Sequence, residues 1–132
     1  MVNAQLYIEK NYPDKENTKK IYVRNWETYP QGEGLTGHLD LRNYKNLEEL
    51  DFFANNITFL NLLGLKRLWS IWIGCNQLKE LDLTDQKKSL THFHIGDNDF
   101  PEQDLSVFSD LVNSQDLRVG GWERNLISLT EV

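Results

Sequence analysis

His92 and His94 are the side chains in this 132-residue sequence that could most readily do chemistry. Because side chains on a β-strand alternate between its two faces, both imidazoles would point to the same side of a strand. With the carboxylate of Asp116 from the next strand, they form a ligand set that zinc and other transition metals accept. A His-x-His pair without a third ligand at a fixed spacing is also typical of a solvated polar patch. We therefore expect a polar patch and no metal, with a metal or small-ligand site at His92 and His94 as an alternative.

The sequence lacks the patterns typical of catalysis or cofactor binding. It contains no phosphate-binding glycine loop, no nucleophile elbow, no zinc-finger spacing of cysteines and no HExxH motif. The glycines between positions 32 and 37 indicate a turn-rich insertion that lengthens the first repeat period. They do not form a dinucleotide-binding motif, because no helix is expected after them. The one cysteine, Cys75, has no adjacent base that could activate it as a nucleophile. We expect a protein that is not an enzyme and holds no cofactor.

Composition and charge restrict the classes of partner. Twenty acidic side chains against fourteen basic ones give a formal net charge of −6, whereas binding to a phosphate backbone needs clustered Lys and Arg. A single cysteine excludes an intramolecular disulfide framework. We find neither a secretory signal pattern nor an apolar run of the roughly 18 residues that a membrane span needs. The sequence therefore predicts a cytoplasmic protein that binds neither nucleic acid nor membranes.

An internal repeat predicts the elements that position these side chains. Residues 47–57, 68–78 and 90–100 fit the pattern L-x-x-L-x-L-x-x-N-x-L at every signature position, with aliphatic or aromatic residues standing for L. These three copies begin 21 and 22 residues apart. Degenerate copies begin at Thr18 and Ser114, and atypical terminal copies are usual in stacked repeats.

The repeat resembles that of leucine-rich-repeat proteins, from about residue 18 to residue 122. Residues 47–51 and 98–106, and the N-terminal stretch 3–14, also resemble the large repeat families of arbuscular mycorrhizal fungi. The resemblance implies an α/β solenoid, a short right-handed arc with about five parallel strands on its concave face and an N-terminal capping helix. It also implies recognition of a protein or peptide by that face. We expect one domain, residues 1–132, with a helical cap and five coils: 1–17, then 18–46, 47–67, 68–89, 90–113 and 114–132.

The fourth and sixth positions of each copy point the same way from a strand. We expect these pairs to face the core: Ile21 and Val23, Leu50 and Phe52, Ile71 and Ile73, Phe93 and Ile95, Leu117 and Val119. The asparagine of each complete copy stands where the chain turns out of the strand. A carboxamide there can donate and accept hydrogen bonds at once, and so bridge backbone groups of adjacent coils. Asn55, Asn76 and Asn98 are therefore expected to form a structural ladder, not a ligand site.

The positions between the inward pairs face the concave side of the predicted sheet. The predicted binding residues on this side are Tyr22, Asp51, Phe53, Trp72, His92, His94, Asp116 and Arg118. Gly74, Gly96 and Gly120 predict a shallow floor beside Trp72 and His94. The aromatic residues could simply pack across strands, but an exposed Trp beside Tyr and Arg has the composition of an interaction hot spot. We predict that the anchors for a protein or peptide are Tyr22, Trp72, His94 and Arg118.

The two ends of the sequence have different patterns. Residues 3–11 predict a short helix that stops before Pro13 and packs over the first strand. The side chains available for that packing are Ala4, Leu6, Tyr7 and Ile8. No polar cap follows Trp122, and residues 126–132 are rich in apolar side chains. An open strand edge there would invite pairing with another chain, so a self-assembling unit that forms a homodimer through this edge is an alternative function.

Overall fold

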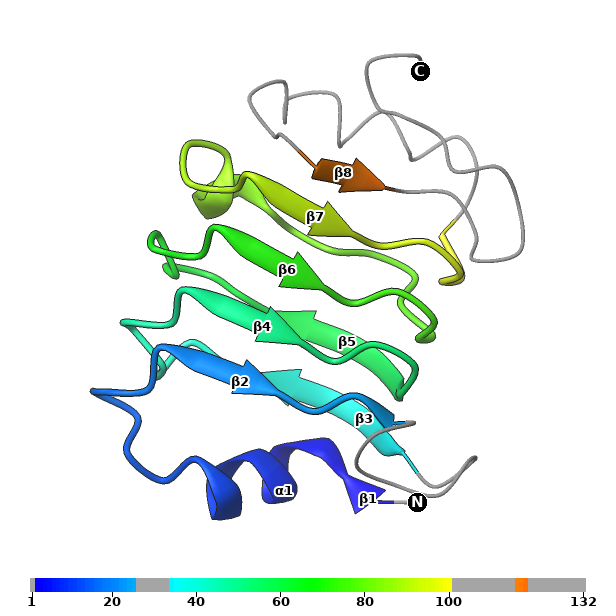
Figure 1. Ribbon diagram of the computed structural model, residues 1–132. Coiled ribbons are helices and arrows are strands. Elements are labelled where there is room, and N and C mark those ends of the chain that lie inside the picture. Colours follow the sequence, from blue (N-terminus) through cyan, green and yellow to red (C-terminus); the bar gives the residue numbers. More distant parts are fainter. Residues whose placement is uncertain (1, 26–33, 101–115, 119–132) are drawn as a thin grey trace.

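The computed structural model describes residues 2–25, 34–100 and 116–118, the last three by their backbone only. These residues form an α/β fold with two sheets of parallel strands, one in front of the other in Figure 1. The first sheet has five short strands in the order β2-β4-β6-β7-β8. Their bounds are Lys20–Tyr22, Glu49–Asp51, Ser70–Trp72, His92–His94 and Asp116–Arg118. The prediction of five parallel strands at these positions is confirmed.

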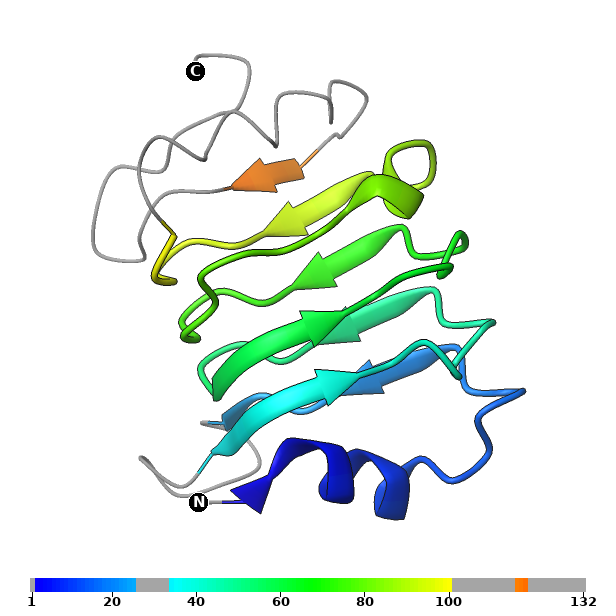
Figure 2. The same ribbon diagram turned by 180° about the vertical axis from the view of Figure 1, so that it is seen from behind.

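The second sheet was not predicted from the sequence. It contains β1 (Val2–Asn3), β3 (Leu35–Asp40) and β5 (Asn56–Asn61) in the order β1-β3-β5, and Figure 2 shows it from behind. The pairing of β3 with β5 shifts register after Gly37, whose φ of +92° lies in the left-handed region that glycine tolerates. The expected insertion between positions 32 and 37 is therefore partly wrong. Residues 35–37 belong to a strand, because Leu35 and Thr36 pair with β1 while Thr36 and Gly37 pair with β5.

Apolar side chains from both sheets fill the space between them. Eight predicted inward residues are at most 1% exposed: Ile21, Val23, Leu50, Phe52, Ile71, Ile73, Phe93 and Ile95. The second sheet adds the buried side chains of Leu35, Leu39, Ile57 and Leu60 to the same core. Burying one such side chain contributes about 1.5–3 kcal/mol, so this shared core stabilises both sheets. The inward prediction is confirmed for these eight residues, while the side chains of Leu117 and Val119 lie outside the described part.

A helix covers one end of the two sheets, at the bottom of Figure 1. This helix, α1, spans Ala4–Asn11, and the side chain of Asn3 caps it by accepting a hydrogen bond from the Leu6 N–H at 3.0 Å. Ala4 and Ile8 are buried in the core, whereas Leu6 is 68% exposed. The prediction that Leu6 packs is wrong. Residues four apart share a helix face, and a residue two positions from both lies on the opposite side.

The remaining helical element among the described residues is the 3₁₀ turn η1 (Thr84–Gln86). None of the helices in this part of the chain has the length and apolar composition of a membrane-spanning segment. The apolar stretch 126–132, and with it the predicted homodimer edge, lies outside the described residues.

Tyr44 connects the N-terminal cap to the turn after β3. Its side chain is 1% exposed, and its hydroxyl donates a hydrogen bond to the carbonyl oxygen of Tyr12 at 2.8 Å. Burial, with a further contribution from the negative charge of Glu9, raises the pKa of the Tyr44 hydroxyl above its ordinary value of 10.0. The fold therefore favours the neutral phenol.

We expect Tyr44→Phe to lower the free energy of unfolding at neutral pH by about 0.5–1.5 kcal/mol, the net contribution of one hydrogen bond. Because the folded-state pKa is raised, this contribution is fully present below the unfolded-state pKa of about 10 and is lost as the pH rises through the folded-state pKa. The stability difference between wild type and variant should therefore shrink at alkaline pH. Urea denaturation at neutral and alkaline pH measures it, and an unchanged difference would contradict the role of Tyr44.

Candidate functional site

The backbone pairing of the five-stranded sheet arranges residues in two rows across the strands. The strands pair so that one row holds Lys20, Glu49, Ser70, His92 and Asp116 in register. The second row holds Tyr22, Asp51, Trp72, His94 and Arg118. We call the side of the sheet that carries these two rows the strand face. The backbone register thus brings together the residues that the alternation of side chains groups in the sequence.

Arg24, two residues beyond the end of β2, is the centre of contacts on the strand face. Its Nε donates a hydrogen bond to Oδ2 of Asp51 at 2.7 Å. Its guanidinium carbon lies 4.9 Å from the ring centroid of Trp72, 5.5 Å from that of Phe53 and 5.6 Å from that of Tyr22. All three distances are within the roughly 6 Å range of cation–π contacts. We call these five residues the Arg24 cluster.

The ion pair inside the Arg24 cluster is shielded from water. The side chains of Arg24 and Asp51 are 19% and 12% exposed, against 63% and 32% for the neighbouring pair Lys20–Glu49. Oδ1 of Asp51 also accepts a hydrogen bond from the Phe53 backbone N–H at 3.1 Å. Charge-assisted hydrogen bonds of this kind offset part of the hydration that a buried pair loses. They hold the guanidinium among the aromatic rings.

Two tryptophan–histidine pairs occur at β6 and β7, and one of them includes Trp72 of the Arg24 cluster. The rings of Trp72 and His94 stack with centroids 3.5 Å apart and planes 13° apart. Trp69 and His92 meet edge to face, at 5.5 Å and 80°. Nδ1 of His92 also lies 2.9 Å from Oγ1 of Thr91. His94 therefore contacts a tryptophan on the neighbouring strand β6, and His92 contacts the tryptophan directly before that strand.

The described residues include no group of three His, Cys, Asp or Glu side chains that could hold a metal ion. His92 and His94 are instead engaged by the ring contacts above. The side chain of Asp116, the third ligand that the sequence suggests, lies outside the described part of the structure, as does that of Arg118.

The structure changes which predicted binding residues a partner could reach. Tyr22 is 45% exposed and Trp72 is half-buried, so both offer contact area. Asp51, Phe53 and His94 are at most 8% exposed. The prediction that these three side chains are open to a ligand is wrong, because the ion pair and the ring contacts of the cluster cover them. They support the surface from below.

Phe53 also closes the predicted glycine floor. A Cβ atom at Gly74 would lie 3.0 Å from Cε2 of Phe53, so the ring occupies the space that the missing side chain leaves. The surface next to Trp72 is therefore a packed aromatic layer at this position. Of the other two glycines in the predicted floor, Gly96 is half-buried, and Gly120 lies outside the described residues.

Arg24 is a functional candidate that alternation places on the concave side of the predicted sheet but that is not among the predicted binding residues. Its position two residues after Tyr22 indicates that both side chains lie on the same face of an extended chain. Its partner Asp51 is 27 residues away in the sequence, and only the pairing of β2 with β4 brings the two together.

The three predicted ladder asparagines lie at the turns that follow β4, β6 and β7. The side-chain oxygen of each accepts a hydrogen bond from a backbone N–H at 2.8–3.0 Å. Their side-chain nitrogens donate to backbone carbonyl oxygens, two of which are shared. The Phe52 carbonyl accepts from Asn55 and Asn76, and the Ile73 carbonyl accepts from Asn76 and Asn98. These side chains are thus occupied by backbone groups.

No protein-family model, curated protein or solved structure matches this chain. What the strand face can bind is therefore inferred from its own side chains. Tyr22 and Trp72 are the partly exposed side chains of the Arg24 cluster, and the shielded Arg24–Asp51 ion pair holds them in place.

Proposed function

We propose that this chain is a leucine-rich-repeat solenoid and that its strand face is a concave surface that binds a protein or peptide. The solenoid is supported by the agreement between the sequence period and the strand pairing. Leu50, Ile71 and Phe93 stand 21 and 22 residues apart and are partners in register. Asn76 shares one backbone carbonyl acceptor with Asn55 and another with Asn98, so neighbouring ladder positions are linked in the same order as the repeats. Stacked coils of this type leave one extended sheet surface for a partner.

The observation that carries the binding proposal is a partly exposed aromatic pair held by a shielded cation. Tyr22 and Trp72 both contact the guanidinium of Arg24, which Asp51 fixes at 2.7 Å. Aromatic side chains that are already immobilised lose little conformational entropy on binding. Trp, Tyr and Arg are also enriched among the residues that dominate interface energies. We infer that Tyr22 and Trp72 contact the partner while Arg24, Asp51 and His94 position them.

We propose no catalytic, metal-binding or cofactor-binding role for this chain. The large repeat families of arbuscular mycorrhizal fungi are the proposed relatives, supported by the sequence resemblance at residues 47–51 and 98–106. The proposed location is the cytoplasm.

We expect Trp72→Ala to weaken peptide binding at least tenfold, which corresponds to about 1.4 kcal/mol. Peptides are first selected against the wild-type protein from a displayed random library. The dissociation constant of the best peptide is then measured by fluorescence polarisation for wild type and Trp72→Ala. Loss of the ring removes apolar contact area and the stacking partner of His94.

Trp69→Ala is the matched control, because Trp69 is also exposed, at 37%, and also contacts a histidine. It should change the affinity by less than about threefold, as for a residue outside the centre of an interface. Circular dichroism checks that both variants keep the wild-type fold. Selected peptides that bind Trp72→Ala as tightly as wild type would refute the strand face as their site.

A further inference from the structure

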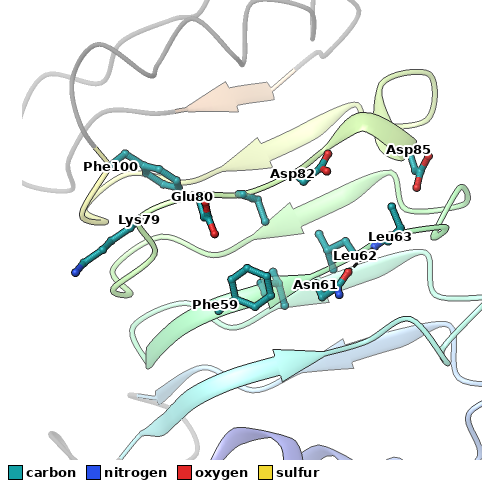
Figure 3. A pocket seen from close by; sticks show the side chains of 11 residues that line it. Phe59, Asn61, Leu62, Leu63, Lys79, Glu80, Asp82, Asp85 and Phe100 are labelled. Atoms are coloured by element: carbon teal, nitrogen blue, oxygen red, sulfur yellow. Dashed lines mark hydrogen bonds between the residues drawn. The ribbon is translucent and has the colours of Figure 1, made fainter.

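A groove of about 500 Å³ is lined in part by Phe59, Leu60 and Asn61 of β5, a strand of the three-stranded sheet. One wall is β5 with the residues just after it, and the other is the non-helical, non-strand segment 79–83 with Asp85 and Phe100 (Figure 3). Its volume is in the usual range of ligand sites, roughly 300–1,000 Å³. None of the residues predicted to bind a partner from the sequence lies in it.

The two walls are joined at both ends and separate between them. At one end, the Gln77 N–H donates to the Ile57 carbonyl oxygen at 2.9 Å. At the other, Nε2 of Gln86 donates to the Leu62 carbonyl oxygen at 2.8 Å, and the Gly64 N–H donates to Oδ2 of Asp85 at 2.6 Å. No hydrogen bond joins residues 58–61 to residues 79–83 in the described structure, where β5 is an edge strand of its sheet.

An edge strand next to a groove can accept an added strand through its backbone. Residues 58–61, between the two closures, span about 13 Å at roughly 3.3 Å per residue. That length accommodates an extended segment of about four residues. The unpaired stretch of β5 is therefore long enough for a short extended peptide lying along it.

The side chains of the groove are apolar at its base and mainly acidic at its rim. Leu60 and Leu81 are buried lining residues, and Phe59 and Phe100 lie toward one end in Figure 3. The rim carries the carboxylates of Glu80, Asp82 and Asp85. Among the described lining residues Lys79 is the one basic side chain, and Figure 3 shows it directed away from the others. The described lining residues therefore carry three carboxylates and one ammonium group, a net negative charge, with the ammonium group of Lys87 also acting on Asp82.

Asp82 stays ionised at neutral pH. Its Oδ1 accepts hydrogen bonds from both the backbone N–H and the hydroxyl of Thr84, at 2.9 and 2.6 Å. These bonds lower the pKa of the Asp82 carboxyl below its ordinary value of 3.8. The carboxylate keeps further lone pairs with which to accept a hydrogen bond from a cationic side chain.

We propose that this groove binds an extended basic peptide as an added strand along β5. Arginine or lysine side chains of the peptide pair with Glu80, Asp82 and Asp85, and an apolar side chain packs against Phe59 and Phe100. The site is independent of the strand face, so the chain has two binding surfaces, one on each sheet.

The probe is a fluorescein-labelled hexapeptide in which arginine alternates with valine and phenylalanine. We expect saturable binding in fluorescence polarisation, with Glu80→Lys weakening it at least about fivefold through charge reversal at the rim. Glu16→Lys is the control, since it changes the net charge equally at an exposed position outside the groove. It should change the affinity less than about twofold at physiological salt, where exposed charges beyond roughly 8 Å are screened.

Two further peptides test the added strand. In one peptide the odd-numbered amides are N-methylated and in the other the even-numbered amides. The peptide that has lost the N–H groups facing β5 should bind at least about tenfold more weakly than the other. Equal binding of both methylated peptides, or no saturable binding of the parent peptide, would overturn the proposal. So would an equal loss in Glu16→Lys, which would assign the effect to net charge.

Two outcomes would show that the basic peptide binds elsewhere or that the groove has a different occupant. If Trp72→Ala abolishes binding of the basic peptide while Glu80→Lys does not, the peptide occupies the strand face and the groove proposal fails. If light scattering shows a dimer that Glu80→Lys dissociates, the occupant is a second copy of this chain. Retained binding in Trp72→Ala with loss in Glu80→Lys supports the groove whether or not the strand face also binds a partner.

Discussion

Asn76→Ala is expected to lower the free energy of unfolding by about 2–4 kcal/mol, a large share of the roughly 5–15 kcal/mol typical of a folded domain. Asn76 is the middle ladder asparagine, with a side chain 6% exposed. Its oxygen accepts from the Ile57 N–H at 3.0 Å, and its nitrogen donates to the carbonyl oxygens of Phe52 and Ile73 at 2.9 and 3.1 Å.

The loss is concentrated at one backbone group. The Phe52 carbonyl still accepts from Asn55 in the variant, and the Ile73 carbonyl still accepts from Asn98. The buried Ile57 N–H loses the acceptor that Asn76 provides, and an unsatisfied buried donor costs about 1–3 kcal/mol. The remainder of the expected effect comes from the lost donor bonds and the space that the shorter side chain leaves.

Urea denaturation followed by circular dichroism measures this effect. The matched control is Asn56→Ala, because Asn56 is a half-buried asparagine whose side chain accepts from Gln77 at 3.3 Å. The control should cost at most about 0.5 kcal/mol, as for other substitutions at partly exposed sites. Equal losses in the two variants would refute the special role of the ladder position.

Arg24→Met is expected to cost about 2–3 kcal/mol, somewhat below the 3–5 kcal/mol typical of breaking a fully buried ion pair, because both partners retain some exposure. The variant keeps much of the apolar volume of the side chain but removes the charge 2.7 Å from Asp51. It also removes the cation beside the rings of Tyr22, Phe53 and Trp72. Asp51 would then lie mostly buried without this counter-charge.

Lys20→Met is a nearby control, because Lys20 lies on β2, which ends two residues before Arg24, and Glu49 lies on β4 with Asp51. The Lys20–Glu49 pair has an N–O distance of 3.2 Å but is largely exposed, and such pairs contribute about 0–1 kcal/mol. Denaturation of both variants at low and high salt gives the comparison. A cost for Arg24→Met no greater than that for Lys20→Met would show that the Arg24–Asp51 pair does not stabilise the fold.

The strands of the five-stranded sheet and their inward side chains could be predicted because both follow from a short period. Alternation along a strand decides which face a residue such as Ile71 lies on, and the repeat indicates how often strands occur. The helix was predictable for the same reason, although Leu6 was placed on the wrong side. Its exposure depends on which face of α1 meets the core, and a short apolar run does not specify that.

The amino-acid sequence by itself therefore determined the strand positions, the buried pairs and the row that contains Tyr22 and Trp72. Tertiary structure alone decided the second sheet, the burial of Asp51 and Phe53 around Arg24, and the groove beside β5. The physical reason is range. Periodicity acts between neighbouring residues, whereas an ion pair across 27 residues or a gap between two walls depends on which distant segments pack together and how closely.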